Sequence, residues 1–214
     1  MYNRANDKVS FLTHLIGALL GVAGTALVVA KPFIFTDITG LQLAAAIIYC
    51  TSLVALYSAS AAYHYADETS GVRRLLRKVD HSMIYVLIAG TYTPVCLVVF
   101  TQPKGTYFCA GIWAVALLGM ILKILWIDCP RIISVAIYLL LGWSILLDIP
   151  AISLFSFGGR LFLILGGVFY SIGAIIYGIK RPNISKEFGF HEIFHIFVML
   201  GSLMHFIMVA LFIL

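Results

Sequence analysis

The last 25 residues of the chain, positions 190–214, read FHEIFHIFVMLGSLMHFIMVALFIL. This run can cross a bilayer as a helix, because a membrane-spanning helix needs about 20 mostly apolar residues. It nevertheless carries His191, Glu192 and His195 near its start. Ionisable groups inside a membrane helix are costly and mark candidate functional sites. The stretch therefore predicts both a membrane fold and a functional centre at one end of the last helix.

The same apolar character extends along the whole chain. Of its 214 residues, 62% are hydrophobic and 11% are charged, which is too apolar for a soluble domain. We predict an all-α integral membrane protein, in which residues 1–214 form a single seven-transmembrane helix bundle. The seven predicted spans cover roughly residues 10–31, 40–65, 78–101, 105–127, 131–151, 158–180 and 190–214.

Basic residues indicate how the bundle is oriented. With the N-terminus inside, eleven Lys and Arg residues fall on inner segments, and only Lys31, Lys104 and Arg160 fall on outer ones. Because inner loops of membrane proteins are enriched in basic residues, we predict a cytosolic N-terminus and an external C-terminus. The net charge of +5 does not favour a nucleic-acid partner, since these charges flank the spans.

This topology places most of the histidines in one layer of the membrane, near the cytosolic ends of four spans. Two carboxylates at membrane depth fall in the same layer. Random scatter would not favour such a coincidence, so the layer is the predicted functional site. Its members are His14, His64, His81, His191 and His195, together with Asp80 and Glu192.

Three of these histidines suit a zinc ion. His191 and His195 are four residues apart and share one helix face, and His64 ends the second span in the same layer. A catalytic zinc site has three protein ligands and an open position for water. Asp80 would accept a hydrogen bond from that water, and Ser60, one turn from His64, would bond the water or a substrate carbonyl. The alternative is an interhelical polar network without metal.

Two other histidines are predicted to have supporting roles. His14 is expected to be a structural group or to support a ligand, and not to bind the metal itself. His205 lies ten residues beyond His195, which places it about 15 Å deeper at 1.5 Å per residue. It is therefore expected to form an interhelical hydrogen bond.

Four segments together resemble the bacterial hemolysin III branch of the progestin and adipoQ receptor family. The resemblance extends over nearly the whole chain, in order, and it is specific as a set. The segments are THLIG at 13–17, SAAYH at 60–64, DHSMIYVLIAGTYTP at 80–94 and FGFHEIFH at 188–195.

The resemblance implies a seven-helix bundle in a bacterial plasma or inner membrane that holds zinc near its cytosolic side. In the adiponectin receptors of animals, three histidines bind zinc, and an aspartate and a serine lie close to the metal's water. Such receptors hydrolyse ceramide, and the bacterial branch is linked to hemolysis and to membrane lipid homeostasis. The matching positions in this sequence are His64, His191, His195, Asp80 and Ser60.

The chain also departs from the family pattern. The branch usually has E-x-x-N-x-x-T-H near the first span, where this chain has Asp7, Ser10, Thr13 and His14. Asp7 replaces the glutamate of the pattern conservatively and is expected to keep its role. Ser10 replaces the asparagine, so the role of the asparagine does not carry over to this chain. The resemblance does not make Glu192 the general base.

We predict a zinc-dependent hydrolase of lipid amide or ester bonds, acting on a ceramide-like or other fatty-acyl substrate. A second hypothesis is a non-enzymatic sensor of membrane state, or a hemolysin-type pore-forming protein, in which zinc only joins helices. A third is an intramembrane zinc protease, because HEIFH matches H-E-x-x-H. Such a protease needs an aspartate ligand from another helix. The nearest candidate, Asp148, is predicted to lie at the opposite face of the membrane.

Overall fold

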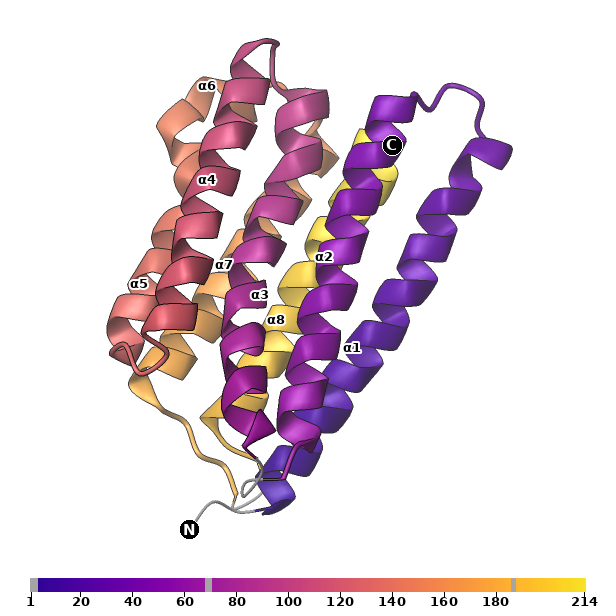
Figure 1. Ribbon diagram of the computed structural model, residues 1–214. Coiled ribbons are helices and arrows are strands. Elements are labelled where there is room, and N and C mark those ends of the chain that lie inside the picture. The colour runs from indigo at the N-terminus through magenta and orange to yellow at the C-terminus, as the bar shows by residue number, and fades with distance from the viewer. Residues whose placement is uncertain (1–3, 68–70, 186–187) are drawn as a thin grey trace.

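The protein is a bundle of long helices, described by a computed structural model over residues 4–67, 71–185 and 188–214 (Figure 1). Within these ranges there are seven helical spans long and apolar enough to cross a membrane, and there is no strand. The predicted all-α, seven-span architecture is confirmed. In chain order the elements are α1 (Arg4–Ala30), η1 (Lys31–Phe33), α2 (Gly40–Tyr65), α3 (Val72–Pro94), η2 (Val95–Val99), α4 (Lys104–Leu125), α5 (Arg131–Gly142), η3 (Ser144–Asp148), α6 (Ile149–Ile152), α7 (Phe157–Ile179), α8 (Phe190–Met208) and η4 (Val209–Ile213).

The fifth span differs from the single helix predicted at 131–151. Regular helix ends at Gly142, a 3-10 helix follows, and the short α6 completes the crossing. Pro150 lies in the first turn of α6. Because proline has no backbone N–H and clashes with the carbonyl four residues earlier, an unbroken helix through Leu146 and Pro150 would be unfavourable.

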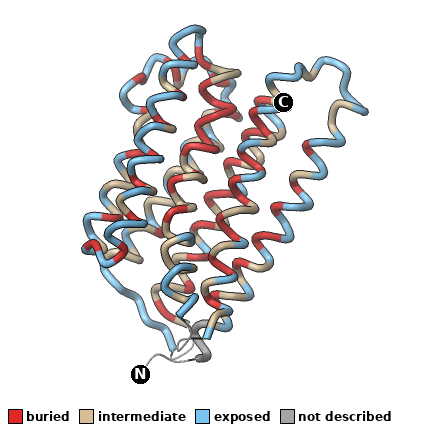
Figure 2. Tube along the Cα trace, in the orientation of Figure 1, coloured by how far each residue is buried: buried red, intermediate tan, exposed pale blue. Residues whose placement is uncertain are grey.

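The helices that carry the candidate site lie at the centre of the bundle. α3 packs against α2, α4 and α5, and α8 packs against α7 and α1. The pair α7 and α8 approaches closely through glycines: a Cβ on Gly201 would lie 2.9 Å from the Tyr170 ring, and one on Gly166 would clash with His205. Buried residues face these contacts, while the exposed positions lie on the outside of the bundle (Figure 2). Many of those exposed side chains are Leu, Ile, Val or Phe, as expected for a surface that contacts lipid.

The start of α1 and the C-terminal end of the chain lie at opposite ends of the bundle (Figure 1). This is the arrangement that an odd number of spans requires. Which end faces the cytosol remains a prediction from the distribution of basic residues.

Candidate metal centre

The three predicted metal ligands lie together between α2 and α8. His64, His191 and His195 each offer one ring nitrogen within 4.8 Å of the others. The Nε2 atoms of His64 and His191 are 3.2 Å apart. Two nitrogens bound to one tetrahedral zinc at 2.0–2.1 Å would be about 3.3 Å apart, so the observed spacing suits a shared ion. Three imidazoles are also a donor set that zinc accepts readily.

Helix α8 begins in a way that presents two of these histidines. Gly189 is its N-cap, and the Glu192 side chain reaches back to accept a hydrogen bond of 2.9 Å from the Gly189 backbone N–H. His191 and His195 then follow on successive turns and share a face. The first turn of α8 is therefore held by Glu192, directly beside the candidate ligands.

Both carboxylate oxygens of Glu192 accept hydrogen bonds. Its second oxygen, Oε1, accepts a hydrogen bond of 2.9 Å from the Ser10 hydroxyl of α1, and its side chain is buried. It does not line the cavity that contains the other candidate site residues. Glu192 thus joins α1 to α8, and Ser10 contributes to this contact at the position where the family pattern has asparagine. The side chain of Asp7 lies outside the described residues.

Thr13 contacts a candidate ligand directly, a role that the sequence analysis did not assign to it. Its Oγ1 lies 3.3 Å from the Nδ1 of His195 and 3.0 Å from the carbonyl oxygens of Val9 and Ser10. If the His195 Nδ1–H donates to Thr13, the hydroxyl donates onward to a backbone carbonyl and Nε2 is left for a metal. The only sequence signal was that Thr13 precedes His14 in the TH pair of the family motif.

We expect the substitution Thr13→Val to weaken zinc binding by about 10–100-fold, because partners that orient a ligating histidine typically contribute that much. Valine has nearly the same shape as threonine but cannot accept the hydrogen bond. The affinity should be measured by competition with a zinc chelator in detergent. Thr25→Val is the matched control, because in the described structure Thr25 bonds to the Gly21 carbonyl of its own helix and to the Cys50 side chain, and to none of the candidate ligands. Equal weakening in both variants would contradict the orienting role.

His14 lies against the centre without a hydrogen bond. Its ring stacks on His195 with 3.6 Å between centroids and 9° between planes. Both ring nitrogens are buried and have no hydrogen-bond partner in the described structure. This placement beside a candidate ligand fits the supporting role predicted from the sequence.

Asp80 and Ser60 line the same cavity as His191 and His195. The Asp80 carboxylate lies 3.3 Å from the His81 Nδ1, and its side chain is 16% exposed. Ser60 is buried one turn before His64 on α2. The structure therefore brings all five residues named as candidate site residues to one end of the bundle.

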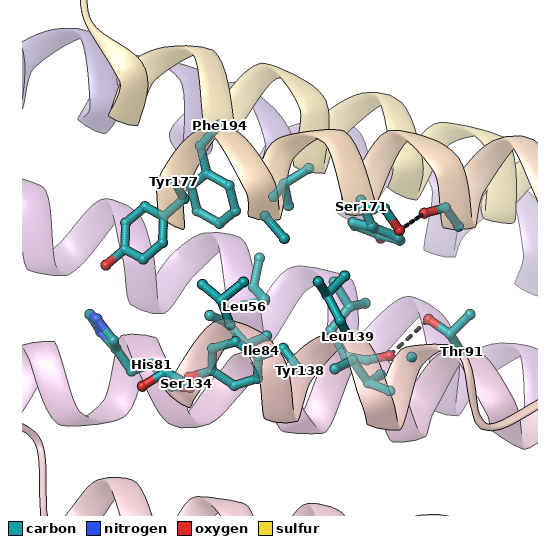
Figure 3. Close-up of a pocket in the computed structure, with 18 of the residues that line it drawn as sticks. Leu56, His81, Ile84, Thr91, Ser134, Tyr138, Leu139, Ser171, Tyr177 and Phe194 are labelled. Atoms are coloured by element: carbon teal, nitrogen blue, oxygen red, sulfur yellow. Dashed lines mark hydrogen bonds between the residues drawn. The ribbon is translucent and has the colours of Figure 1, made fainter. Parts of the chain in front are cut away.

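The cavity has a volume of about 450 Å³ and extends between α3, α5, α7 and α8. His81 and Tyr177 lie at one end of the close-up, and Thr91 and Ser171 lie at the other (Figure 3). The side chains labelled between them include Leu56, Ile84 and Leu139. The cavity thus has one end that carries most of its histidines and charged side chains, while the rest of its lining is mainly apolar with a few hydroxyls, such as those of Thr91 and Ser171.

His205 lies away from the cluster, as predicted from its depth. Its Nε2 is 3.2 Å from the Leu163 carbonyl oxygen of α7. The expected interhelical hydrogen bond is confirmed.

The protease hypothesis loses its candidate aspartate. Asp148 is buried and pairs with Lys104 at 2.5 Å, where α4 begins. The other end of α4 carries Lys123, which bonds to Ser134 near the histidine end of the cavity. Asp148 therefore lies one membrane span away from His191 and His195.

Fold and site together define a multi-pass helical membrane protein with a buried cluster of three histidines that could hold a metal ion. Residues 2–206 match the family described as Haemolysin-III related. The chain is 34% identical to Hemolysin-3 of Bacillus cereus over 95% of its own length and 90% of that protein. It is 33% identical to the Hemolysin-3 homolog of Bacillus subtilis (strain 168) over 94% of its own length and 92% of that protein. The chain therefore belongs to the haemolysin III family and is a bacterial multi-pass membrane protein.

Proposed function

We propose that the protein is a zinc-dependent hydrolase of amide or ester bonds in membrane lipids, with a role in membrane lipid homeostasis. One observation carries this proposal. His191, His195, Asp80 and Ser60 line one end of a cavity whose remaining lining is mostly apolar, and His64 lies beside His191 and His195 in the cluster of three imidazoles. The polar and apolar groups of a ceramide-like or other fatty-acyl lipid are distributed in the same way, because its polar linkage is attached to a long apolar chain.

His64, His191 and His195 would hold the zinc ion. Zinc in such a site supplies a water-derived nucleophile at neutral pH and polarises a carbonyl oxygen. The hydrogen bond that Thr13 would accept from the His195 Nδ1–H would keep the ring in the tautomer and orientation that metal binding needs.

The reaction itself would use two further residues. Asp80 would accept the proton that the attacking water loses, and would return it to the leaving amine or alkoxide oxygen. Ser60 would donate a hydrogen bond to the negative oxygen that develops on the carbonyl. The acyl chain would lie along Leu56, Ile84 and Leu139, where burial of apolar surface favours its binding.

The test is fatty acid release from a ceramide or phospholipid by purified protein in detergent. We expect release to stop after a chelator has removed the metal and to return with about one equivalent of zinc. Magnesium should not restore it, because hard oxygen ligands suit that ion and imidazoles do not. Release that is unaffected by chelation, or absent from zinc-loaded protein with every lipid tested, would contradict the proposal.

A second candidate function is suggested by the name of one relative, Hemolysin-3 of Bacillus cereus. In that case this protein would permeabilise membranes, and zinc would join α2 to α8 without catalysis. A pore needs a continuous polar lining, whereas this cavity is lined mainly by apolar side chains. Zinc-independent leakage of a dye from liposomes that contain the protein, without lipid cleavage, would favour this alternative.

A further inference from the structure

A lysine is buried at the histidine end of the cavity. Lys123 lies in the last turn of α4, is 1% exposed, and lines the cavity. Its Nζ donates a hydrogen bond of 2.5 Å to the Ser134 hydroxyl of α5. Figure 3 shows Ser134 beside His81, at the same end of the cavity. The ammonium group therefore lies within the bundle, at the end of the cavity that also holds His81.

No carboxylate neutralises this lysine within the described ranges. The nearby acidic residues are already paired: Asp80 with His81 at 3.3 Å, and Asp128 with the guanidinium of Arg77 at 3.1 Å. Asp128 also lies 3.6 Å from Arg74, so a single carboxylate serves two arginines. Burying a charge without a partner of opposite charge is unfavourable. The hydrogen bond to the neutral Ser134 hydroxyl offsets only part of the cost of removing the ammonium group from water.

Two more cations line the same cavity. Arg77 reaches it from α3, where its guanidinium pairs with Asp128 at 3.1 Å. Arg131 reaches it from α5, where its guanidinium lies 4.3 Å from the centre of the Tyr177 ring and donates to the Tyr177 carbonyl oxygen at 3.2 Å. Among Lys, Arg, Asp and Glu, the cavity lining thus contains three basic residues and one aspartate, Asp80. Arg77 is paired with Asp128, whereas no carboxylate pairs with Lys123 or Arg131 in the described part of the chain. These two cations leave a local excess of positive charge that favours an anion.

We infer that Lys123, Arg77 and Arg131 form an anion-binding site that holds the carboxylate or phosphate head group of a lipid, while its acyl chain occupies the apolar part of the cavity. Guanidinium and ammonium groups are the usual partners of both anions. The lining beyond them is apolar and includes Ile84 and Leu139, so an anion that carries a chain matches the cavity better than a free one. This binding site does not require that the lipid be cleaved.

The test measures binding of radiolabelled probes to metal-free, detergent-solubilised protein, which separates this inference from the proposed hydrolysis. The probes are palmitate, a lysophosphatidate and hexadecanol, which has the chain but no charge. Lys123→Met keeps the length of the side chain and removes its charge. We expect it to weaken palmitate or lysophosphatidate binding at least tenfold and to change hexadecanol binding by less than twofold. Lys8→Met, which removes an exposed lysine of α1, should leave all three unchanged.

The two sources of anion are distinguished within the same experiment. Competition by millimolar inorganic phosphate would show that the site accepts a free anion, whereas resistance to it would show that the chain is required. Preference for palmitate or for lysophosphatidate then identifies the head group. Equal loss of charged and neutral probes in Lys123→Met would show that the lysine only holds α4 to α5 through Ser134. That result, or anion binding that is unchanged in a folded Lys123→Met protein, would overturn the inference.

Discussion

The His195→Ala protein should purify with almost no zinc, whereas the unmodified protein should carry about one zinc per chain. His195 lies at the centre of the cluster, within reach of His64 and His191 on one side and of Thr13 on the other. Removing it takes away one of three ligands, and the loss of affinity should exceed the roughly 10–100-fold that loss of an orienting partner costs. Elemental analysis of protein purified in detergent measures the zinc content directly. His191→Ala should behave in the same way.

His205→Ala is the matched control for this experiment. His205 is buried in the same helix, but it bonds to the Leu163 carbonyl of α7 and is not part of the cluster. Its removal also leaves a cavity in the bundle, so any general loss of packing would appear in this variant too. The control should retain its zinc. If all three variants lost metal equally, the loss would reflect misfolding, and the metal centre would have no support.

The seven spans could be predicted from sequence because they depend on a property that is summed over many residues. Each needs about 20 apolar positions, and a few polar residues such as Glu192 do not hide such a run. The break in the fifth span depends instead on local backbone chemistry, with Pro150 eight residues after Gly142. The length and mean hydropathy of a segment do not predict such a break.

The histidine cluster was also accessible from sequence, because two simple rules act together. The four-residue spacing of His191 and His195 fixes a common helix face, and the alternation of spans brings His64 to the same end of the bundle. The same rules place Asp80 and Ser60 in this layer, and the resemblance to the family implies the same assignment. Neither rule required knowledge of how the helices are rotated.

The contacts around the cluster could not be predicted in this way, because they depend on rotation and tilt. The Ser10–Glu192 bond and the stacking of His14 on His195 each need one particular face of α1 to meet α8. Lys123 is similar. In the sequence it is one more basic residue at a cytosolic span end, and only the packing of α4 against α5 turns its side chain into the cavity.

The Asp80→Asn protein should be folded and loaded with zinc, yet slower in lipid cleavage by about 10²–10⁴-fold, the usual contribution of a general base. Asparagine has nearly the same size as aspartate but cannot take up the proton. The three histidine ligands are untouched, so zinc content should stay near one per chain. Fatty acid release and elemental analysis on the same preparation measure the two quantities together. Loss of zinc in Asp80→Asn would instead make Asp80 a ligand.

The substitution Glu192→Gln distinguishes Asp80 as the general base from Glu192 as the general base, the role that the glutamate has in H-E-x-x-H proteases. Both Glu192 oxygens already accept hydrogen bonds, from Gly189 and Ser10. A glutamine keeps one accepting oxygen, so we expect a stability loss of about 1–3 kcal/mol and a much smaller loss of activity than in Asp80→Asn. Thermal unfolding measures the first effect and fatty acid release the second. The reverse order of activities would make Glu192 the base, and that would require its carboxylate to leave the capping position at the start of α8 and turn towards the cavity.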